Sequence, residues 1–365
     1  MPEEKEEVII GEPCGEVRPQ TWRSPVKPSA AEIADHDLTH CPYRNWCSVC
    51  VEAMGREDPH PRQGPKEKSE VPEVGMDYDK YGEEEKVGTQ ITVLVVKDSE
   101  TGMIKAHVVD VKGPKDEWVI KKVCKDIEGF GHSEIMLKTD GEPALVAVQT
   151  KIIARREATT VPENPPAYDP KANGCIEKGV QDVNARLRTI KVALEARFGV
   201  AMSIKLPIFE WALEHAAFVH NRFQVGHDGL TPYRRSTGKV WRQRIVEFGE
   251  QVHGKLAARR AATKNKTRTV HKNKMSSRWI KGTWVGMVDR SHESILITHQ
   301  GKAVRVRTVK RRPLQERWCL ETVTKITATP RRPVPGKEDE ELKSAKWAKT
   351  WRLEKQPKQP RQLKI

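Results

Sequence analysis

The chain lacks long apolar segments, a cysteine framework and a secretory leader. Its apolar runs are short: Ile91–Val96, interrupted only by Thr92, falls far below the roughly 20 residues that a membrane-spanning helix needs. Its seven cysteines are odd in number and unevenly spread, which argues against a disulfide framework and for a reducing compartment. The first residues are acidic instead of basic and then apolar, unlike a secretory signal. We therefore expect an intracellular protein that does not enter a membrane.

Acidic residues are scarce relative to basic ones. The 365 residues include 65 Lys and Arg against 50 Asp and Glu, a formal net charge of +15. Between Gln251 and Val288 there is no acidic residue at all. This imbalance favours a polyanionic partner, and within that stretch we expect Lys264, Lys266 and Arg268 to contact nucleic-acid phosphates.

Composition and periodicity divide the chain into segments. Hydrophobic residues make up only 37%, so we expect part of the chain to be disordered. The central region alternates strand and helix patterns, and three short strand patterns split by polar turns follow later. The expected segments are a disordered leader (1–30), a His/Cys zinc-binding unit (31–60), an α/β core (70–235), a basic linker (251–282), a small β-rich unit (283–313) and a disordered basic tail (326–365).

The zinc-binding unit is predicted from four residues near the N-terminus. His36 and His40 are four residues apart, so they would share one face of a helix, and Cys47 and Cys50 form a Cys-x2-Cys pair. Together they supply the four tetrahedral ligands of a structural zinc site, which leaves no open position for a catalytic water. Cys41 is an alternative ligand, and the alternative to the whole site is a set of unligated surface residues.

Three acidic residues stand in strand or helix patterns and form a candidate catalytic site. Carboxylates carried by two strands and a helix can hold two hard divalent cations, the arrangement that phosphoryl transfer with paired metals needs. Asp79 and Glu142 are the nearest alternatives, because a chain with 50 acidic residues offers many spaced triplets. The three residues are Asp77 in the strand pattern Val74–Asp79, Asp140 at the end of the strand pattern Ile135–Asp140, and Glu177 at the start of an amphipathic helix from Asn173 to about Arg197.

This pattern resembles the catalytic core of retroviral and retrotransposon integrases, in which a strand-borne Asp and an Asp at a strand end are followed by Glu about 35 residues later. The run Tyr168-x-Pro170-x-x-Asn173-Gly174-x-x-Glu177 is similar to the copia-type members, and Gly229-Leu230-Thr231-Pro232-Tyr233 to the segment that closes their core. From roughly Ala31 to Pro313 the chain thus resembles the integrase region of a copia-type LTR retrotransposon Pol polyprotein. One departure is that Gly141-Glu142-Pro143 follows Asp140, where many relatives have Asn and Gly.

The resemblance implies an α/β fold: a ribonuclease-H-like core with a mixed sheet flanked by helices at 70–235, a small N-terminal zinc-binding unit, and a small DNA-binding β-barrel at 283–313. It implies that Asp77, Asp140 and Glu177 bind two Mg²⁺ or Mn²⁺ ions, roughly 3.5–4 Å apart. The activity would be 3′-end processing and strand transfer of DNA by a homo-oligomer in the nucleus, with element ends and a target duplex as partners. On the helix beside Glu177, the residues expected to contact DNA are Lys178, Gln181, Asn184 and Arg188.

Two other functions remain open. A non-catalytic DNA- or chromatin-binding protein derived from such an element would share the basic surface, although the presence of all three carboxylates counts against loss of the site. A plain ribonuclease H is disfavoured by the His/Cys cluster and by the basic C-terminal region.

Overall fold

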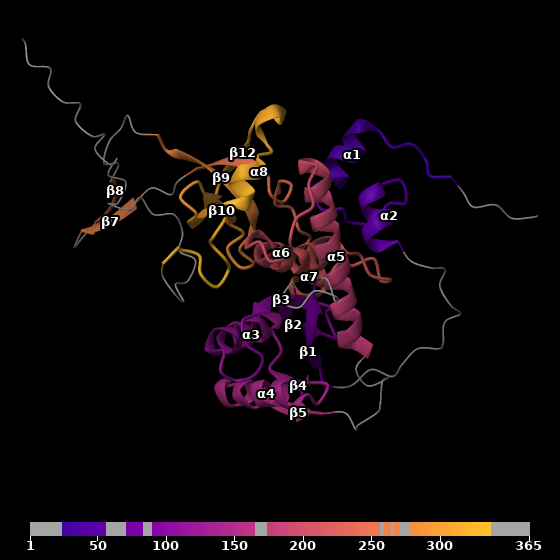
Figure 1. Cartoon of the computed structure of the whole chain (residues 1–365). Coiled ribbons are helices and arrows are strands. Elements are labelled where there is room, and N and C mark those ends of the chain that lie inside the picture. Colours follow the sequence, from indigo (N-terminus) through magenta and orange to yellow (C-terminus); the bar gives the residue numbers. More distant parts are fainter. Residues whose placement is uncertain are drawn as a thin grey trace, which may run out of the picture.

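A computed structural model describes residues 24–55, 71–82, 90–164, 174–255, 259–263, 266–270 and 277–336. Figure 1 shows two short N-terminal helices, α1 (Ala30–His36) and α2 (Ser48–Met54), beside a long helix of a central α/β body. A second sheet, built from the C-terminal part of the chain, lies on the far side of that body.

The central sheet has five strands in the order β3-β2-β1-β4-β5. Strands β1, β2 and β3 pair antiparallel, whereas β1–β4 and β4–β5 pair in parallel, so the predicted mixed sheet is confirmed. Strand β5 was not predicted, because it is short and contains Pro162; a proline is tolerated there since β5 is an edge strand. The strands are β1 (Glu73–Tyr81), β2 (Ile91–Asp98), β3 (Ile104–Val109), β4 (Glu134–Lys138) and β5 (Thr159–Glu163).

Helices cover both faces of this sheet. On one face, α3 (Glu117–Phe130) and α4 (Pro143–Arg155) pack with Met76 and Tyr78 of β1 in one hydrophobic cluster. On the other face, α5 and α6 pack with Tyr81 in a second cluster, which continues into the C-terminal sheet. The helix predicted from Asn173 to about Arg197 is confirmed to within about one residue at each end. The remaining helices of the body are α5 (Gly174–Phe198), α6 (Ile208–Phe223) and α7 (Pro232–Thr237).

The other edge of the sheet, at β3, is capped by a side chain. Asn221 of α6 is fully buried, and its amide donates to the Ile104 carbonyl oxygen (2.7 Å) while its oxygen accepts from the Ile104 N–H (2.8 Å). The edge backbone at Ile104 therefore already has its hydrogen-bonding partners within the chain.

Helix α5 lies unusually close to β1 because glycine stands at the point of contact. A Cβ atom at Gly75 would lie only 2.8 Å from Cβ of Ile176, and one at Gly179 would lie 2.8 Å from Cδ of Lys97. Further along, the Tyr81 hydroxyl donates to the carbonyl oxygen of Val180 (3.4 Å). These contacts fix the first turns of α5 over β1 and the neighbouring strand β2.

The C-terminal sheet is antiparallel, in the order β11-β10-β9-β6-β12. The three strands predicted within 283–313 are confirmed, but strand pairing gives an open order, and a closed barrel stays a prediction. The strands are β6 (Gln251–Lys255), β9 (Trp279–Met287), β10 (Ser294–Thr298), β11 (Ala303–Val306) and β12 (Val309–Arg311), with a separate hairpin of β7 (Arg259–Thr263) and β8 (Lys266–Val270).

Two expected segment limits are wrong. Residues 251–255 and 279–282, assigned to a linker for their lack of acidic residues, are strand residues, because charge count does not reveal that Val252 is buried in the sheet. The disordered tail was expected from 326, yet Ile326 and Ala328 are buried after η1 (Leu314–Glu316) and α8 (Leu320–Thr324). Residues 1–23 of the expected leader and 337–365 of the tail lie outside the described residues.

Charged side chains pair inside the central body, and two of them also pair with a residue of the C-terminal sheet region. His107 of β3 lies between two carboxylates, with its Nε2 2.6 Å from Asp126 of α3 and its Nδ1 3.1 Å from Glu214 of α6. Nearby, Asp289 after β9 pairs with Lys105 and with Arg222 (3.0 Å). Asp289, whose side chain is 42% exposed, is thus one ion-pair link between the C-terminal sheet and the central body. Among the helices in the described ranges, none is long and apolar enough to cross a membrane.

The Gly75 contact gives a first test. Gly75→Ala should lower the free energy of unfolding by about 1–3 kcal/mol, because the new methyl group overpacks against Ile176. Urea unfolding measures the change. Gly129→Ala is the matched control: it is an exposed helical glycine with open space at its Cβ position, so the same substitution should raise stability by about 0.5–1 kcal/mol. Equal effects at both sites would contradict the close approach of α5.

The charged pairs around His107 give a second test. Burial opposes the charged form of His107, but the charge of Asp126 and hydrogen bonds to Asp126 and Glu214 outweigh it, so the pKa of His107 is raised. The imidazolium therefore stabilises the fold fully below the unfolded-state pKa of about 6.5 and is lost as pH rises through the folded-state pKa. His107→Gln should cost about 3 kcal/mol near pH 6, and less in alkaline buffer. A cost that is independent of pH, measured by urea unfolding, would show that the ring contributes by packing alone.

Candidate functional site

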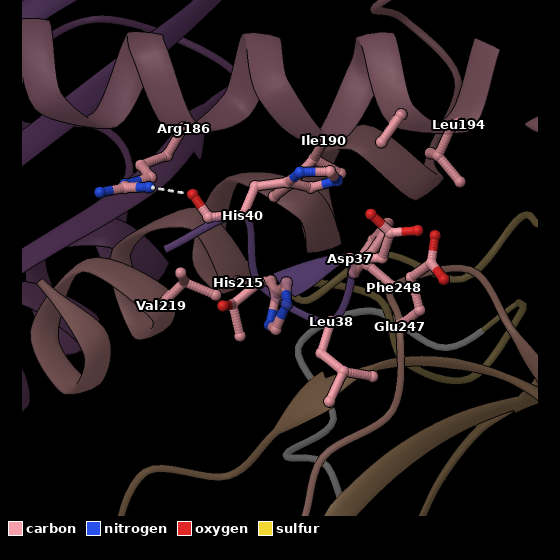
Figure 2. A pocket seen from close by; sticks show the side chains of 12 residues that line it. Asp37, Leu38, His40, Arg186, Ile190, Leu194, His215, Val219, Glu247 and Phe248 are labelled. Carbon is pink, nitrogen blue, oxygen red and sulfur yellow. Dashed lines mark hydrogen bonds between the residues drawn. The ribbon is translucent and has the colours of Figure 1, made fainter. Parts of the chain in front are cut away.

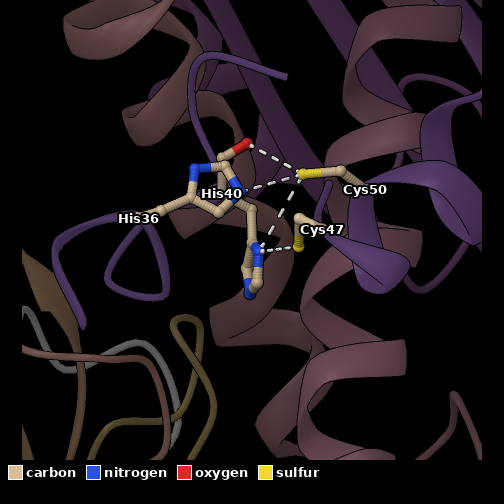
Figure 3. Close-up of side chains that lie close together, drawn as sticks. All are labelled: His36, His40, Cys47 and Cys50. Atoms are coloured by element: carbon tan, nitrogen blue, oxygen red, sulfur yellow. Dashed lines mark hydrogen bonds between the residues drawn. The ribbon is translucent and has the colours of Figure 1, made fainter. Parts of the chain in front are cut away.

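Four buried side chains near the N-terminus come together as predicted. The ligand atoms of His36, His40, Cys47 and Cys50 all lie within 4.8 Å of one another (Figure 3). His36 Nε2 is 3.2 Å from Cys50 Sγ, and His40 Nδ1 is 3.5 Å and 4.0 Å from the Sγ atoms of Cys47 and Cys50. Tetrahedral zinc, with bonds of about 2.1 Å to nitrogen and 2.3 Å to sulfur, separates such atoms by about 3.6 Å. The four residues fit one zinc ion.

The local backbone explains how these ligands meet, and it corrects one expectation. Helix α1 begins with a capping box between Ser29 and Glu32 and ends at His36, so the two histidines do not share a helix face. His40 instead lies in the following turn, in the left-handed region (φ 48°), which turns the chain back toward His36. Cys47 caps α2, and Cys50 lies in its first turn.

Burial sets the protonation of these groups. It lowers the pKa of His40 to about 4, which keeps the imidazole in the neutral form that binds metal. It also raises the pKa of the Cys50 thiol to about 12, so metal binding has to displace a proton there. Cys41, the alternative ligand, is buried too, but it is outside the group and its Sγ lies 3.9 Å from the side-chain oxygen of Gln224.

Two of the three predicted catalytic carboxylates lie at the same level of the central sheet. In the parallel pairing of β1 with β4, Gly75 is opposite Lys138. Asp77 and Asp140 each follow two residues later, beyond the last paired residues, so both carboxylates lie near the end of this strand pair. Burial, and next the negative charge of Asp140, raise the pKa of Asp77 to about 6. Both causes disfavour the ionised form of Asp77, which a bound cation would favour.

Glu177 approaches the same face but does not complete the group. It is exposed in the first turn of α5, next to Ile176, which contacts β1 at Gly75. Side chains of a strand alternate between its two faces, so Gly75 and Asp77 share one face. Because α5 packs on that face at Gly75, Glu177 and Asp77 lie on the same side of the sheet. Within the described residues, however, the His/Cys group is the only set of ligand atoms gathered closely enough to hold a metal ion; the three carboxylates do not form such a group.

The two alternative acids have other surroundings. Asp79 is half-buried on the same strand face as Asp77, and burial raises its pKa. Its carboxylate accepts a hydrogen bond from the Lys80 N–H (2.8 Å). Glu142 precedes α4 and is ion-paired with Lys112 (2.9 Å). Neither replaces Asp77 or Asp140 in the pattern.

The predicted DNA-contacting stripe on α5 has partners within the chain. Lys178 pairs with Asp182 one turn further along, and Arg188 donates to the Ala53 carbonyl oxygen of α2 (3.1 Å). Gln181 is exposed and Asn184 is half-buried. Of the basic set, Lys264 lies outside the described residues, and only the backbone of Lys266 and Arg268, in β8, is described. Their contact with nucleic acid stays a prediction.

Sequence reasoning missed Arg186, a buried residue of α5. Its Nη1 donates to the carbonyl oxygen of the predicted zinc ligand His40 (3.1 Å), and its Nη2 donates to the side chain of Gln224. The sequence did offer one indication that this residue is buried: Arg186 directly precedes Leu187 of the apolar stripe of α5.

The zinc site gives a third test. The purified full chain should contain one equivalent of zinc by elemental analysis, and a chelator should lower its melting temperature, because so small a unit depends on its metal for stability. Cys47→Ser should lose the ion, since it removes a ligand of the group. Cys41→Ser, equally a buried thiol but outside the group, should retain it. Full zinc content in Cys47→Ser would show that the ligand set is wrong.

No protein-family model matches this chain, and no curated protein matches it. Among solved structures, it is similar to a chain of the cryo-EM structure of the simian T-cell lymphotropic virus intasome in complex with PP2A regulatory subunit B56 gamma. The two chains share 15% identity and a TM-score of 0.36, over 73% of this chain and 87% of that one. It is also similar to the HTLV-2 integrase catalytic core domain in complex with magnesium, in trimeric and dimeric forms, each at 15% identity and a TM-score of 0.34, over 46% of this chain and 99% of that one. Because these TM-scores are below 0.5, nothing in the function proposed below rests on them.

Proposed function

We propose that this protein is an integrase-like polynucleotidyl transferase that processes DNA 3′-ends and joins them to a target duplex, with Asp77, Asp140 and Glu177 as the metal-binding carboxylates. The observation that carries the proposal is the placement of Asp77 and Asp140 at one level of adjacent parallel strands, with α5 presenting Glu177 on the same face. The copia-type motif around Glu177, the mixed sheet flanked by helices and the net charge of +15 support it. Only the resemblance supports the further proposal of a nuclear homo-oligomer.

The residues of the chain hold and position the reacting groups. Asp77 is half-buried and fixed in the middle of a paired strand, whereas Asp140 and Glu177 are exposed toward solvent, where a DNA strand has access. The Gly75 contact and the Tyr81 hydrogen bond hold α5 at a fixed distance from β1, so the position of Glu177 relative to Asp77 depends on the backbone more than on a flexible loop.

The donor set suits hard divalent cations. Carboxylate oxygens are the ligands that Mg²⁺ and Mn²⁺ prefer. Burial first, and next the charge of Asp140, raise the pKa of Asp77, and a bound cation would favour its ionised form. Bound at Asp77, Asp140 and Glu177, such cations would activate the oxygen of water or of a DNA 3′-hydroxyl and offset charge on the phosphodiester. No nucleophile from the protein is needed, because the attacking oxygen belongs to water or DNA.

One observation favours a second candidate, a non-catalytic DNA-binding protein. Among the described residues, the three carboxylates do not form a group close enough to hold a metal ion. The two functions are distinguished by a joining assay with a mixture of short labelled duplexes, run with Mg²⁺ and with EDTA. The transferase forms longer products only with the metal, whereas a binding protein retards the duplexes in both conditions and joins none.

The assay gives a fourth test. Asp77→Asn, Asp140→Asn and Glu177→Gln should each reduce joining at least ~10²-fold, because each removes a negative charge that offsets the cations. Urea unfolding of the same variants checks that the fold is retained. Asp79→Asn is the matched control, since it removes a half-buried carboxylate from the same strand face outside the proposed set, and it should leave joining close to the unsubstituted level. Full joining by Asp140→Asn would remove that residue from the site.

A further inference from the structure

Three arginines of α5 hold the N-terminal unit, which comprises α1, α2 and the turn between them. Arg186 donates to the His40 carbonyl oxygen (3.1 Å), and Arg188 donates to the Ala53 carbonyl oxygen (3.1 Å). Near the end of the helix, Arg197 binds the Asp37 carboxylate (2.9 Å) and also Glu247 (3.0 Å), just before the C-terminal sheet. Of the residues of α5 that were expected to face DNA, Arg188 therefore contacts the N-terminal unit instead.

Apolar packing at this joint is incomplete. A cavity of about 30 Å³, room for about two waters, lies between the N-terminal unit, α5 and α6, and Figure 2 shows Arg186 and His40 at its wall. Apolar side chains such as Leu38, Ile190 and Val219 line it without closing it. Because van der Waals contact is missing there, the polar contacts made by the arginines carry more of the docking.

Arg186 differs from the other two arginines in what it holds. It is buried, with 6% of its surface exposed, and both of its acceptors, the His40 carbonyl and the Gln224 side chain, are neutral oxygens on different segments. The carbonyl belongs to a predicted zinc ligand in a left-handed turn, so its direction depends on the same backbone angles that aim the His40 ring at the metal. Loss of the metal frees that turn and with it the acceptor.

We propose that Arg186 is a positioning residue that couples zinc binding in the N-terminal unit to the order of helix α5, so that the metal at one end of the molecule steadies the helix that carries Glu177. The coupling itself stands on the contacts of Arg186. Its consequence for DNA joining rests on the proposed function, and for that reason the test below uses neither DNA nor joining.

Hydrogen exchange of the full chain tests the coupling, followed in peptides from the middle of α5 with zinc bound and after chelation. Zinc removal should speed exchange there about tenfold in the unsubstituted chain and less than about twofold in Arg186→Ala, which lacks the link. Because coupling between sites is reciprocal, Arg186→Ala should also weaken zinc binding by a similar factor in a chelator competition, while still binding one equivalent.

Lys191→Ala is the matched control. It removes a cation from the same helix whose partner, Glu195, belongs to α5 itself (2.6 Å), so zinc-dependent exchange should match the unsubstituted chain. If α5 exchange in the unsubstituted chain does not depend on zinc, or if Arg186→Ala keeps the full dependence, the proposal is wrong. Should Arg186→Ala fail to fold, Arg186→Lys, which keeps the charge but not the two-pronged geometry, replaces it. Absence of joining activity in the chain would leave this result unaffected.

Discussion

The close approach of α5 to β1 is the constraint that sets the positions of Glu177 and of the N-terminal unit relative to the central sheet. Glycine at positions 75 and 179 removes the side chains that would hold the helix away from the strands. Ile176 can then contact β1 directly, and the next residue, Glu177, stands over the strand of Asp77. With 25 residues, α5 is about 38 Å long, so its first turn serves the carboxylates while its middle and end hold the N-terminal unit.

Buried charge fixes how the C-terminal sheet sits on this body. Removing charges from water is costly unless each finds a partner, so the sheet is held where Asp289 meets both Lys105 and Arg222. Such pairs add little net stability over apolar packing, but a shifted arrangement would leave a charge buried and unpaired. The contacts therefore select one orientation of the second sheet against the first, which matters if both are to meet the same DNA.

Much of the central body could be predicted from the sequence, because its helices and strands are long and strongly periodic. The apolar stripe of α5 and the placement of Asp77 within a strand and of Asp140 just after one are examples. What could not be predicted was set by partners distant in sequence. The sequence does not distinguish Arg188 from other exposed cations, because its acceptor, the Ala53 carbonyl oxygen, is distant in sequence. The turn that brings His40 back toward His36 has no periodic pattern that would predict it. The distance from Glu177 to the two aspartates likewise depends on how α5 packs on β1, which the sequence around Glu177 does not reveal.

Both edges of the central sheet are obstructed, and this limits how copies of the chain can associate. At β3 the Asn221 amide occupies the backbone groups of Ile104, and at β5 Pro162 interrupts the row of N–H groups that another strand would need. A strand added at either edge would therefore meet backbone groups that are already bonded at Ile104, or a missing N–H at Pro162, so the sheet disfavours edge-to-edge pairing of two copies.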